Sequence, residues 1–161
     1  MVDTDALFRI ADAAEEEGRL DFARQSFERG AALGSIDCLT RLAYLYDVGL
    51  GVDVDKTYAM RLYQRAWRRG RSIVAANNIA ILYREHGNHR AMFTWFQRAA
   101  EQGDGSALLD MAKCYLDGLG TSRDPLAARR CLAAAIQSSY ITEAEREEAM
   151  ALMSGLAPRA V

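Results

Sequence analysis

Histidine and cysteine are the residues in this chain best suited to bind a metal ion or act as nucleophiles. The only two histidines, His86 and His89, flank Gly87-Asn88, and Glu85 is the one carboxylate close to them in sequence. A zinc-type site needs three or four such ligands at suitable spacing. We therefore interpret the histidines as part of a polar turn, and a metal-binding or enzymatic protein that uses them is the weaker alternative.

The cysteines give no sign of catalysis either. Cys38, Cys114 and Cys131 are odd in number and irregularly spaced, which suits a reducing compartment better than a disulfide framework. We interpret Cys114 and Cys131 as buried free thiols. Gly-x-Gly occurs twice, but neither copy follows an expected strand as a phosphate-binding loop would. We expect no catalytic residues, metal or cofactor.

A basic cluster is the strongest charged feature of the sequence. Its members have helical spacing and share one face of an expected helix: Arg61, Arg65, Arg68 and Arg69. A solvated outer face is the favoured interpretation, and a binding patch for an acidic partner is the alternative. Nucleic acid is disfavoured, because base-stacking aromatic residues are scarce nearby and the net charge of the chain is −2.

Composition limits the class of protein. The chain has 161 residues, of which 50% are hydrophobic and 26% are charged, and this size fits a single domain over residues 1–161. No apolar run approaches the roughly 18 residues of a membrane span. The first eight residues lack a basic region followed by an apolar stretch, so we expect no secretory signal and a cytoplasmic protein.

The expected secondary structure is helical throughout. Alanine recurs in nearly every window, there are only two prolines, and the alternation typical of strands is missing. The short β-like stretch at residues 51–55 lies beside turn glycines, so it is interpreted as a loop. The predicted fold class is all-α.

Four stretches of the chain share a small residue at the centre of an expected first helix. These residues, spaced by 32, 37 and 32 positions, are Ala11, Ala43, Ala80 and Ala112. A small residue there lets the paired helix approach closely. A second helix follows each of them, so the sequence predicts a stack of four helix–turn–helix units.

Glycines mark the ends of these helices. The first helices are followed by Gly18, Gly49, Gly87 and Gly118, and three of the second helices by Gly34, Gly70 and Gly103. Glycine in a left-handed conformation satisfies the last carbonyl groups of a helix. We therefore expect left-handed glycines at these ends.

The second and fourth units resemble Sel1-like repeats. The resemblance rests on Tyr44-Leu45-Tyr46-Asp47-Val48-Gly49-Leu50-Gly51-Val52 and on Tyr115-Leu116-Asp117-Gly118-Leu119-Gly120, each followed by a second helix. The other two units have shorter loops and look more like the related tetratricopeptide repeats. The resemblance implies a right-handed α-solenoid, with repeats at about residues 5–34, 35–70, 71–103 and 104–139.

A final helix is expected to cap the last repeat at about residues 142–155. Thr142 and Glu145 have the spacing of a capping box. Ala144, Ala149, Met150 and Met153 are expected to cover the repeat, while the acidic residues of the helix face water.

The resemblance also implies where a partner would bind. In such superhelices the first helices line the concave face. By position, the candidate partner-binding residues are Asp12, Glu15, Thr40, Tyr44, Asp47, Asn77, Ile81, Arg84, Lys113 and Leu116. This mixture of aromatic, amide and charged groups suits a polypeptide better than a small apolar ligand.

The favoured function is therefore a non-catalytic module that binds one protein partner. Proteins resembling this family include bacterial immunity proteins, whose partner is a toxin encoded nearby, and adaptors; the sequence does not separate the two roles. A self-assembling structural solenoid is the alternative. We expect a monomer or weak homo-oligomer that binds neither nucleic acid nor a membrane.

Overall fold

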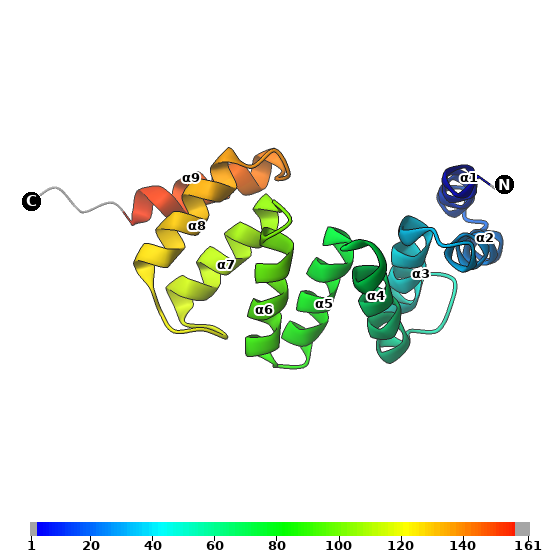
Figure 1. Ribbon diagram of the computed structural model, residues 1–161, viewed down its shortest axis with the longest axis horizontal. Coiled ribbons are helices and arrows are strands. Elements are labelled where there is room, and N and C mark those ends of the chain that lie inside the picture. The colour runs from blue at the N-terminus through cyan, green and yellow to red at the C-terminus, as the bar shows by residue number, and fades with distance from the viewer. Residues whose placement is uncertain (1–2, 157–161) are drawn as a thin grey trace, which may run out of the picture. The chain divides into compact units, whose positions relative to one another are not determined.

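The computed structural model describes residues 3–156, and in this range the chain folds into nine α-helices without a β-strand (Figure 1). This confirms the prediction of an all-α fold. Residues 51–55 form the expected loop. The chain divides into two compact units, residues 1–75 and 76–161, and the division falls within α5 (Ile73–Glu85).

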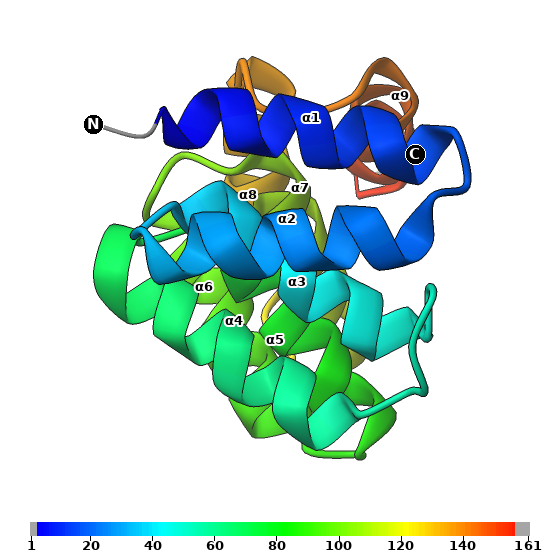
Figure 2. The ribbon, with the colours of Figure 1, turned by 90° about the vertical axis from the view of Figure 1, so that its right-hand side faces the viewer.

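The first unit contains four helices that pack in chain order. They are α1 (Thr4–Glu16), α2 (Leu20–Ala32), α3 (Ile36–Val48) and α4 (Lys56–Gly70). Figure 2 shows α1 lying antiparallel along α2. A short loop joins α1 to α2, and a longer loop, residues 49–55, joins α3 to α4.

The second unit repeats this plan. The end of α5 is followed by α6 (His89–Ala100), α7 (Gly105–Asp117), α8 (Pro125–Gln137) and α9 (Glu143–Gly155). The loop between α5 and α6 is short, and residues 118–124 form the long loop between α7 and α8. Helix α7 packs on α6, α8 and α9.

Side-chain caps set most of the helix starts. A side-chain oxygen accepts a hydrogen bond from the first-turn backbone at Asp3, Ser35, Asp55, Asn88, Asp104, Asp124 and Thr142. Each such cap is worth about 1 kcal/mol. Pro125 opens α8 in the first turn, where its missing N–H costs nothing.

The four small residues at the centres of the first helices are fully buried, as predicted. Ala11, Ala43, Ala80 and Ala112 all have 0% exposure. In the second unit Ala112 belongs to an apolar core with Leu109, Leu132 and Ala149. Close helix packing across alanine is therefore the basis of this fold.

The turn glycines adopt left-handed conformations at all the predicted positions except one. Gly70 lies inside α4, and Arg71, with φ of 53°, is the left-handed residue instead. A Cβ at position 70 would lie 2.9 Å from Cγ1 of Ile36. Gly70 is thus required by the close approach of α3, so the expectation of a left-handed Gly70 was wrong.

The second glycine of each long loop touches the preceding helix pair. A Cβ on Gly51 would lie 2.6 Å from Cβ of Leu20, and a Cβ on Gly120 would lie 2.0 Å from the carbonyl oxygen of His89. Leu20 and His89 are the first residues of α2 and α6. Each long loop therefore rests on the start of the second helix before it.

These contacts reveal a period longer than one helix pair. The same interval in the sequence separates three pairs of equivalent residues: Gly51 and Gly120, Leu20 and His89, and Ala43 and Ala112. We call this interval the long period. Each unit therefore consists of a short-loop repeat followed by a long-loop repeat, and a shift by one long period takes the first unit onto the second.

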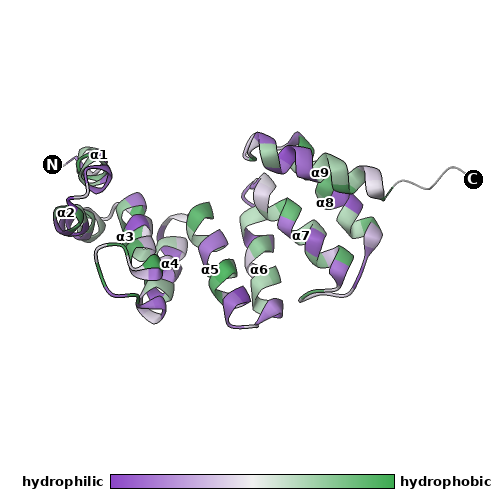
Figure 3. Cartoon of the chain, turned by 180° about the vertical axis from the view of Figure 1, so that it is seen from behind, coloured by the Kyte–Doolittle hydropathy of each residue, from purple (hydrophilic) through white to green (hydrophobic). Residues whose placement is uncertain are grey.

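The final helix has the predicted cap, but the residues that cover the last repeat differ from those expected, because Leu152 also packs on the core. Thr142 and Glu145 form the capping box, and Ala149 and Met153 pack on the core. Met150 is 42% exposed and Ala144 is also exposed, because both fall on the outer face of the helix. Green and purple residues accordingly alternate along α9 in Figure 3.

Candidate functional site

The histidines occupy the short turn of the second unit. His86 Nδ1 lies 2.7 Å from the carbonyl oxygen of Leu82, and His89 starts α6. Over residues 3–156 the structure contains no group of three or more histidine, cysteine, aspartate or glutamate side chains placed to hold a metal ion. His86 therefore contacts the last turn of α5, and the N-cap of α6 is Asn88, with His89 as the first residue of that helix.

The three cysteines are free thiols in this structure. Cys38 and Cys114 are buried, whereas Cys131 is only half-buried, which differs from the expectation that both members of the pair on α7 and α8 are buried. Burial raises the pKa of Cys114 to about 11. A thiol with a raised pKa is a poor nucleophile at neutral pH, which fits a packing role.

On the first unit, an ion pair joins the two first helices. Arg41 on α3 donates to both carboxylate oxygens of Glu15 on α1, with its Nε 2.9 Å from Oε2. The same guanidinium lies 4.8 Å from the ring centre of Tyr44. The pair and the ring form a partly exposed surface, together with half-buried Asp12.

Thr40 and Asp47, which were expected to face a partner, are buried instead. The Thr40 hydroxyl donates to the carbonyl oxygen of Ile36 and lies 3.3 Å from the Ser72 hydroxyl. Asp47 forms an ion pair of 3.0 Å with Lys56 on α4. The resemblance to the repeat family had implied that both face a partner, but Thr40 lies against Ser72 and Asp47 against Lys56. They stabilise the first unit and are left out of the candidate surface.

Asp47 also perturbs a buried tyrosine. The Tyr63 hydroxyl donates to Oδ2 of Asp47 at 3.4 Å. Burial, together with the negative charge of Asp47, raises the pKa of Tyr63 far above its usual value. Tyr63 is therefore a neutral hydrogen-bond donor in the core.

On the second unit, the first-helix surface is a charge network. Lys113 on α7 lies 2.8 Å from Glu148 on α9 and 3.9 Å from Asp110. Burial raises the pKa of the Asp110 carboxyl, and the positive charges of Lys113 and Arg84 oppose that shift. Two of the predicted residues, Arg84 and Lys113, thus act electrostatically on the same carboxyl.

The other predicted residues of the second unit are less exposed. The Asn77 amide donates to Oδ2 of Asp104 at 2.6 Å, which links α5 to the cap of α7. Ile81 is half-buried, and half-buried Leu116 packs against the apolar core. Asn77 and Leu116 thus also stabilise the fold, and Arg84 is the exposed member of the set.

The two first-helix surfaces correspond at a shift of one long period, with opposite sign. Glu15 and Arg41 in the first unit match Arg84 and Asp110 in the second. Sequence reasoning selected Glu15 and Arg84 but missed Arg41, Asp110 and Glu148, because their contacts join residues far apart in the sequence. The long period was the signal that could have revealed the matching positions.

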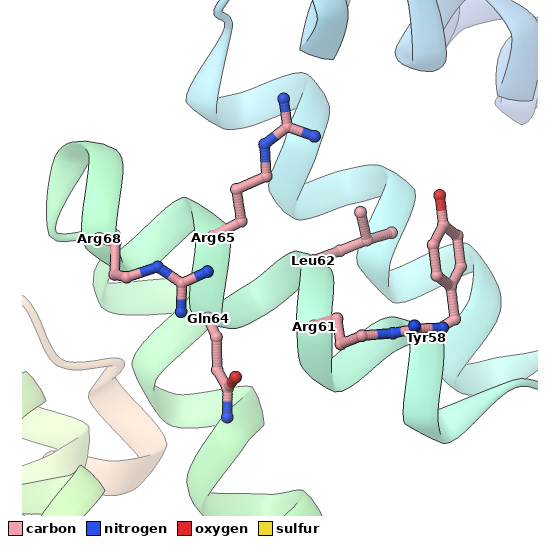
Figure 4. A pocket seen from close by; sticks show the side chains of 6 residues that line it. All are labelled: Tyr58, Arg61, Leu62, Gln64, Arg65 and Arg68. Carbon is pink, nitrogen blue, oxygen red and sulfur yellow. The ribbon is translucent and has the colours of Figure 1, made fainter.

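The arginine cluster lines a shallow hollow of about 340 Å³ on α4 (Figure 4). Its lining residues all come from this helix and are Tyr58, Arg61, Leu62, Gln64, Arg65 and Arg68. The Arg61 guanidinium lies 5.4 Å from the ring centre of Tyr58. Arg69, also on α4, is exposed outside the hollow.

Comparison with protein families decides the identity of the chain. The family model described as Sel1 repeat matches residues 36–70, 93–104 and 105–140, which is slightly more than half of the chain. The chain belongs to the Sel1 repeat family. Sel1 repeat proteins generally mediate protein–protein interactions and are generally non-enzymatic scaffolds.

Solved structures show the same all-α repeat solenoid. A Sel1 repeat protein from Oxalobacter formigenes is similar over 95% of this chain, with a TM-score of 0.81 and 20% identity. A protective antigen with an SLR fold from uropathogenic Escherichia coli strains is similar over 83% of this chain, with a TM-score of 0.71 and 25% identity. This Sel1 repeat chain spans 63% and 30% of those two chains.

No curated protein sequence matches this Sel1 repeat chain at a significant level. Over the described part of the chain, none of the helices combines the length and the apolar character that crossing a membrane requires.

Proposed function

We propose that this Sel1 repeat protein is a non-catalytic module that binds a segment of a partner protein on the first helices of its repeats. The observation that carries the proposal is that the partly exposed polar groups there are already held in place by their neighbours. Tyr44 lies beside Arg41, and Lys113 lies between Asp110 and Glu148. Side chains ordered before binding lose less entropy when a partner arrives.

The repeat family supports this function, and the chemistry of the two surfaces adds detail. The first unit offers Asp12, Glu15 and the Tyr44 ring, and the second offers Ile81, Arg84 and Lys113. Such mixed surfaces suit a polypeptide that presents both charges. The free thiols fit a reducing compartment, and we propose that the protein acts in the cytoplasm.

Two roles fit this proposal. An immunity protein forms a tight one-to-one complex with a toxin encoded beside it, whereas an adaptor binds more weakly or has several targets. The stoichiometry and lifetime of the native complex distinguish them.

The test is capture of native partners by wild-type protein and by two variants. Tyr44→Ala and Arg84→Glu are expected to weaken capture at least about tenfold, as for well-buried interface anchors. Arg129→Glu, an exposed change on α8, is the control and retains capture. Circular dichroism must show equal helix content in all variants.

The opposite result would relocate the site. If Tyr44→Ala and Arg84→Glu capture partners as wild type does, and Arg65→Glu loses them, the first-helix proposal is wrong and the partner binds to α4.

Self-assembly is a second candidate because of one hollow on the first unit that is lined by three apolar and three polar residues. Leu7 and Ile10 of α1 line it with Phe22 of α2, and Ile10 and Phe22 are 51% and 46% exposed. Exposed apolar groups of this kind occur at interfaces. Light scattering that gives one mass over a wide concentration range would exclude this function.

A further inference from the structure

We propose that the α4 arginine face, formed by Arg61, Arg65 and Arg68 around the hollow with Leu62, binds an acidic segment of the partner through its carboxylates. This inference rests on the proposed function, because it assigns a chemical class to part of the polypeptide that the protein would bind.

The charges of this face have no acidic partner among the described residues of the chain. Over residues 3–156, Arg61, Arg65 and Arg68 make no ion pair, and neither does Arg69. Four of the six other arginines of the first unit have acidic partners: Arg9, Arg19, Arg24 and Arg41. Among the described residues, Arg29 and Arg71 have none, and Arg71 stacks on the Trp67 ring instead. Helix α4 contains five basic residues and no acidic one.

Helix stability explains only part of this cluster. Arg68 and Arg69 lie in the last turn of α4, where positive charge favours the negative end of the helix dipole. Arg61 and Arg65 lie earlier, where that effect has faded. Their concentration on one face therefore calls for another explanation.

The geometry of the face fits carboxylates on an extended or helical segment. Arg61, Arg65 and Arg68 span seven helical positions, which is about 10 Å along the axis. Guanidinium groups bind carboxylates through two parallel hydrogen bonds. The half-buried Tyr58 ring adds apolar surface within the same hollow for the methylene groups of an acidic side chain, and buried Leu62 lies beneath it with 6% exposure.

The corresponding helix of the second unit serves as an internal comparison. At a shift of one long period, Arg61 matches Arg130, but Arg65 and Arg68 match Ala134 and Gln137. Tyr58 matches Ala127, so the ring is also missing from α8. Since both helices fill the same place in the repeat, packing alone does not require the arginines of α4.

The surroundings favour a polypeptide over nucleic acid. Single-stranded nucleic acids bind through several aromatic side chains on which their bases stack. Among the described residues that line the hollow, Tyr58 is the only aromatic one, and its ring already contacts Arg61 and, at 4.8 Å and edge-on, Tyr46. The net charge of the chain, −2, also opposes a long polyanion.

The experiment is isothermal titration calorimetry of the full chain with a 12-residue peptide whose two termini are blocked. The peptide contains six glutamates, alanines and a central leucine. The control peptide has glutamine in place of every glutamate. We expect the acidic peptide to bind in 50 mM NaCl, and to bind at least about tenfold more weakly to Arg61→Gln/Arg65→Gln. The control variant Arg129→Gln/Arg130→Gln on α8 changes the net charge equally and should differ from wild type less than about twofold.

Three results would overturn the inference: no binding of the acidic peptide to wild type, equal loss in both double variants, or tighter binding of a 12-nucleotide oligothymidylate. If Arg61→Gln/Arg65→Gln loses helix content, the site is mapped instead by NMR, from the amide chemical-shift changes that the acidic peptide causes in labelled wild-type protein. Changes that lie outside α4 would contradict the proposal. The first-helix variants are tested separately by native capture. Failure of the peptide experiment with successful capture therefore removes only this inference.

Discussion

At the scale of single residues, each unit places opposite charges on its two first helices, but the helix that carries the positive charge differs between the units. Glu15 on α1 pairs with Arg41 on α3, and the corresponding residues of the second unit are Arg84 and Asp110, whose charges also attract. Glu15 is 9% exposed through its side chain and Arg41 is 34% exposed. The position therefore favours two opposite charges, and either helix can supply the positive one.

This symmetry predicts a rescue by charge exchange. Glu15→Arg should lower the free energy of unfolding by about 2 kcal/mol, because it places two cations together in a half-buried site. Adding Arg41→Asp should recover at least about half of that loss by recreating the arrangement of the second unit. Urea denaturation of the two single variants and the double variant measures the coupling.

The control for this cycle is Arg9→Asp, whose partner Asp3 is exposed and 4.0 Å away. It should cost less than about 0.5 kcal/mol. Strictly additive effects of Glu15→Arg and Arg41→Asp would show that the pair contributes no coupling.

At the scale of elements, the long loops are held by a close contact with the preceding helix pair. Gly87 and Gly120 both have left-handed conformations, with φ of 71° and 75°. A Cβ on Gly87 would meet nothing within 4 Å, whereas one on Gly120 would meet the His89 carbonyl oxygen at 2.0 Å. A substitution at Gly87 therefore tests only the cost of a left-handed backbone, whereas a substitution at Gly120 adds a steric clash to that cost.

Alanine at these two positions should have different costs. Gly87→Ala should destabilise the protein by about 1 kcal/mol, the cost of a left-handed alanine. Gly120→Ala should cost at least about 3 kcal/mol, because the loop or the start of α6 must also move. Thermal denaturation compares them, and similar melting temperatures would show that the contact with His89 is easily relieved.

The sequence predicts the secondary-structure elements better than it predicts which individual side chains are buried. Buried Ala43, left-handed Gly49 and the capping box at Thr142 follow from local patterns, and the structure confirms them. The resemblance to the repeat family also implied which side of a first helix faces a partner, but neither it nor local spacing shows which residues cover that side. Thr40 lies against Ser72, 32 residues away, and Asp47 lies against Lys56, on the next helix after the long loop.

At the scale of the whole molecule, the two units share a plan but differ in their interiors. Thr40, Asp47 and Tyr63 form polar contacts inside the first unit, and their counterparts in the second are Leu109, Leu116 and Leu132. The second unit also gains α9 as a cover for its core. Apolar burial contributes to stability without requiring matched hydrogen bonds.

This difference predicts uneven protection from hydrogen exchange. Helix α7 packs on three neighbours within its unit, whereas the main neighbour of α1 is α2. Amides of α7 should therefore exchange at least about tenfold more slowly than those of α1 under native conditions. Exchange measured by NMR or mass spectrometry tests this, and equal protection would mean that both helices open only when the whole chain unfolds.

The seat of each long loop on the preceding helix pair also bears on how such proteins change length during evolution. The loop backbone at Gly51 packs against Leu20, and the loop backbone at Gly120 packs against the start of α6. A long-loop repeat that is separated from the short-loop repeat before it therefore loses the surface against which its loop packs. Insertion or deletion of a single helix pair would therefore remove one of these loop contacts. Duplication or deletion of one long period preserves every loop contact. The smallest segment that this chain can gain or lose without new compensating substitutions is therefore two helix pairs.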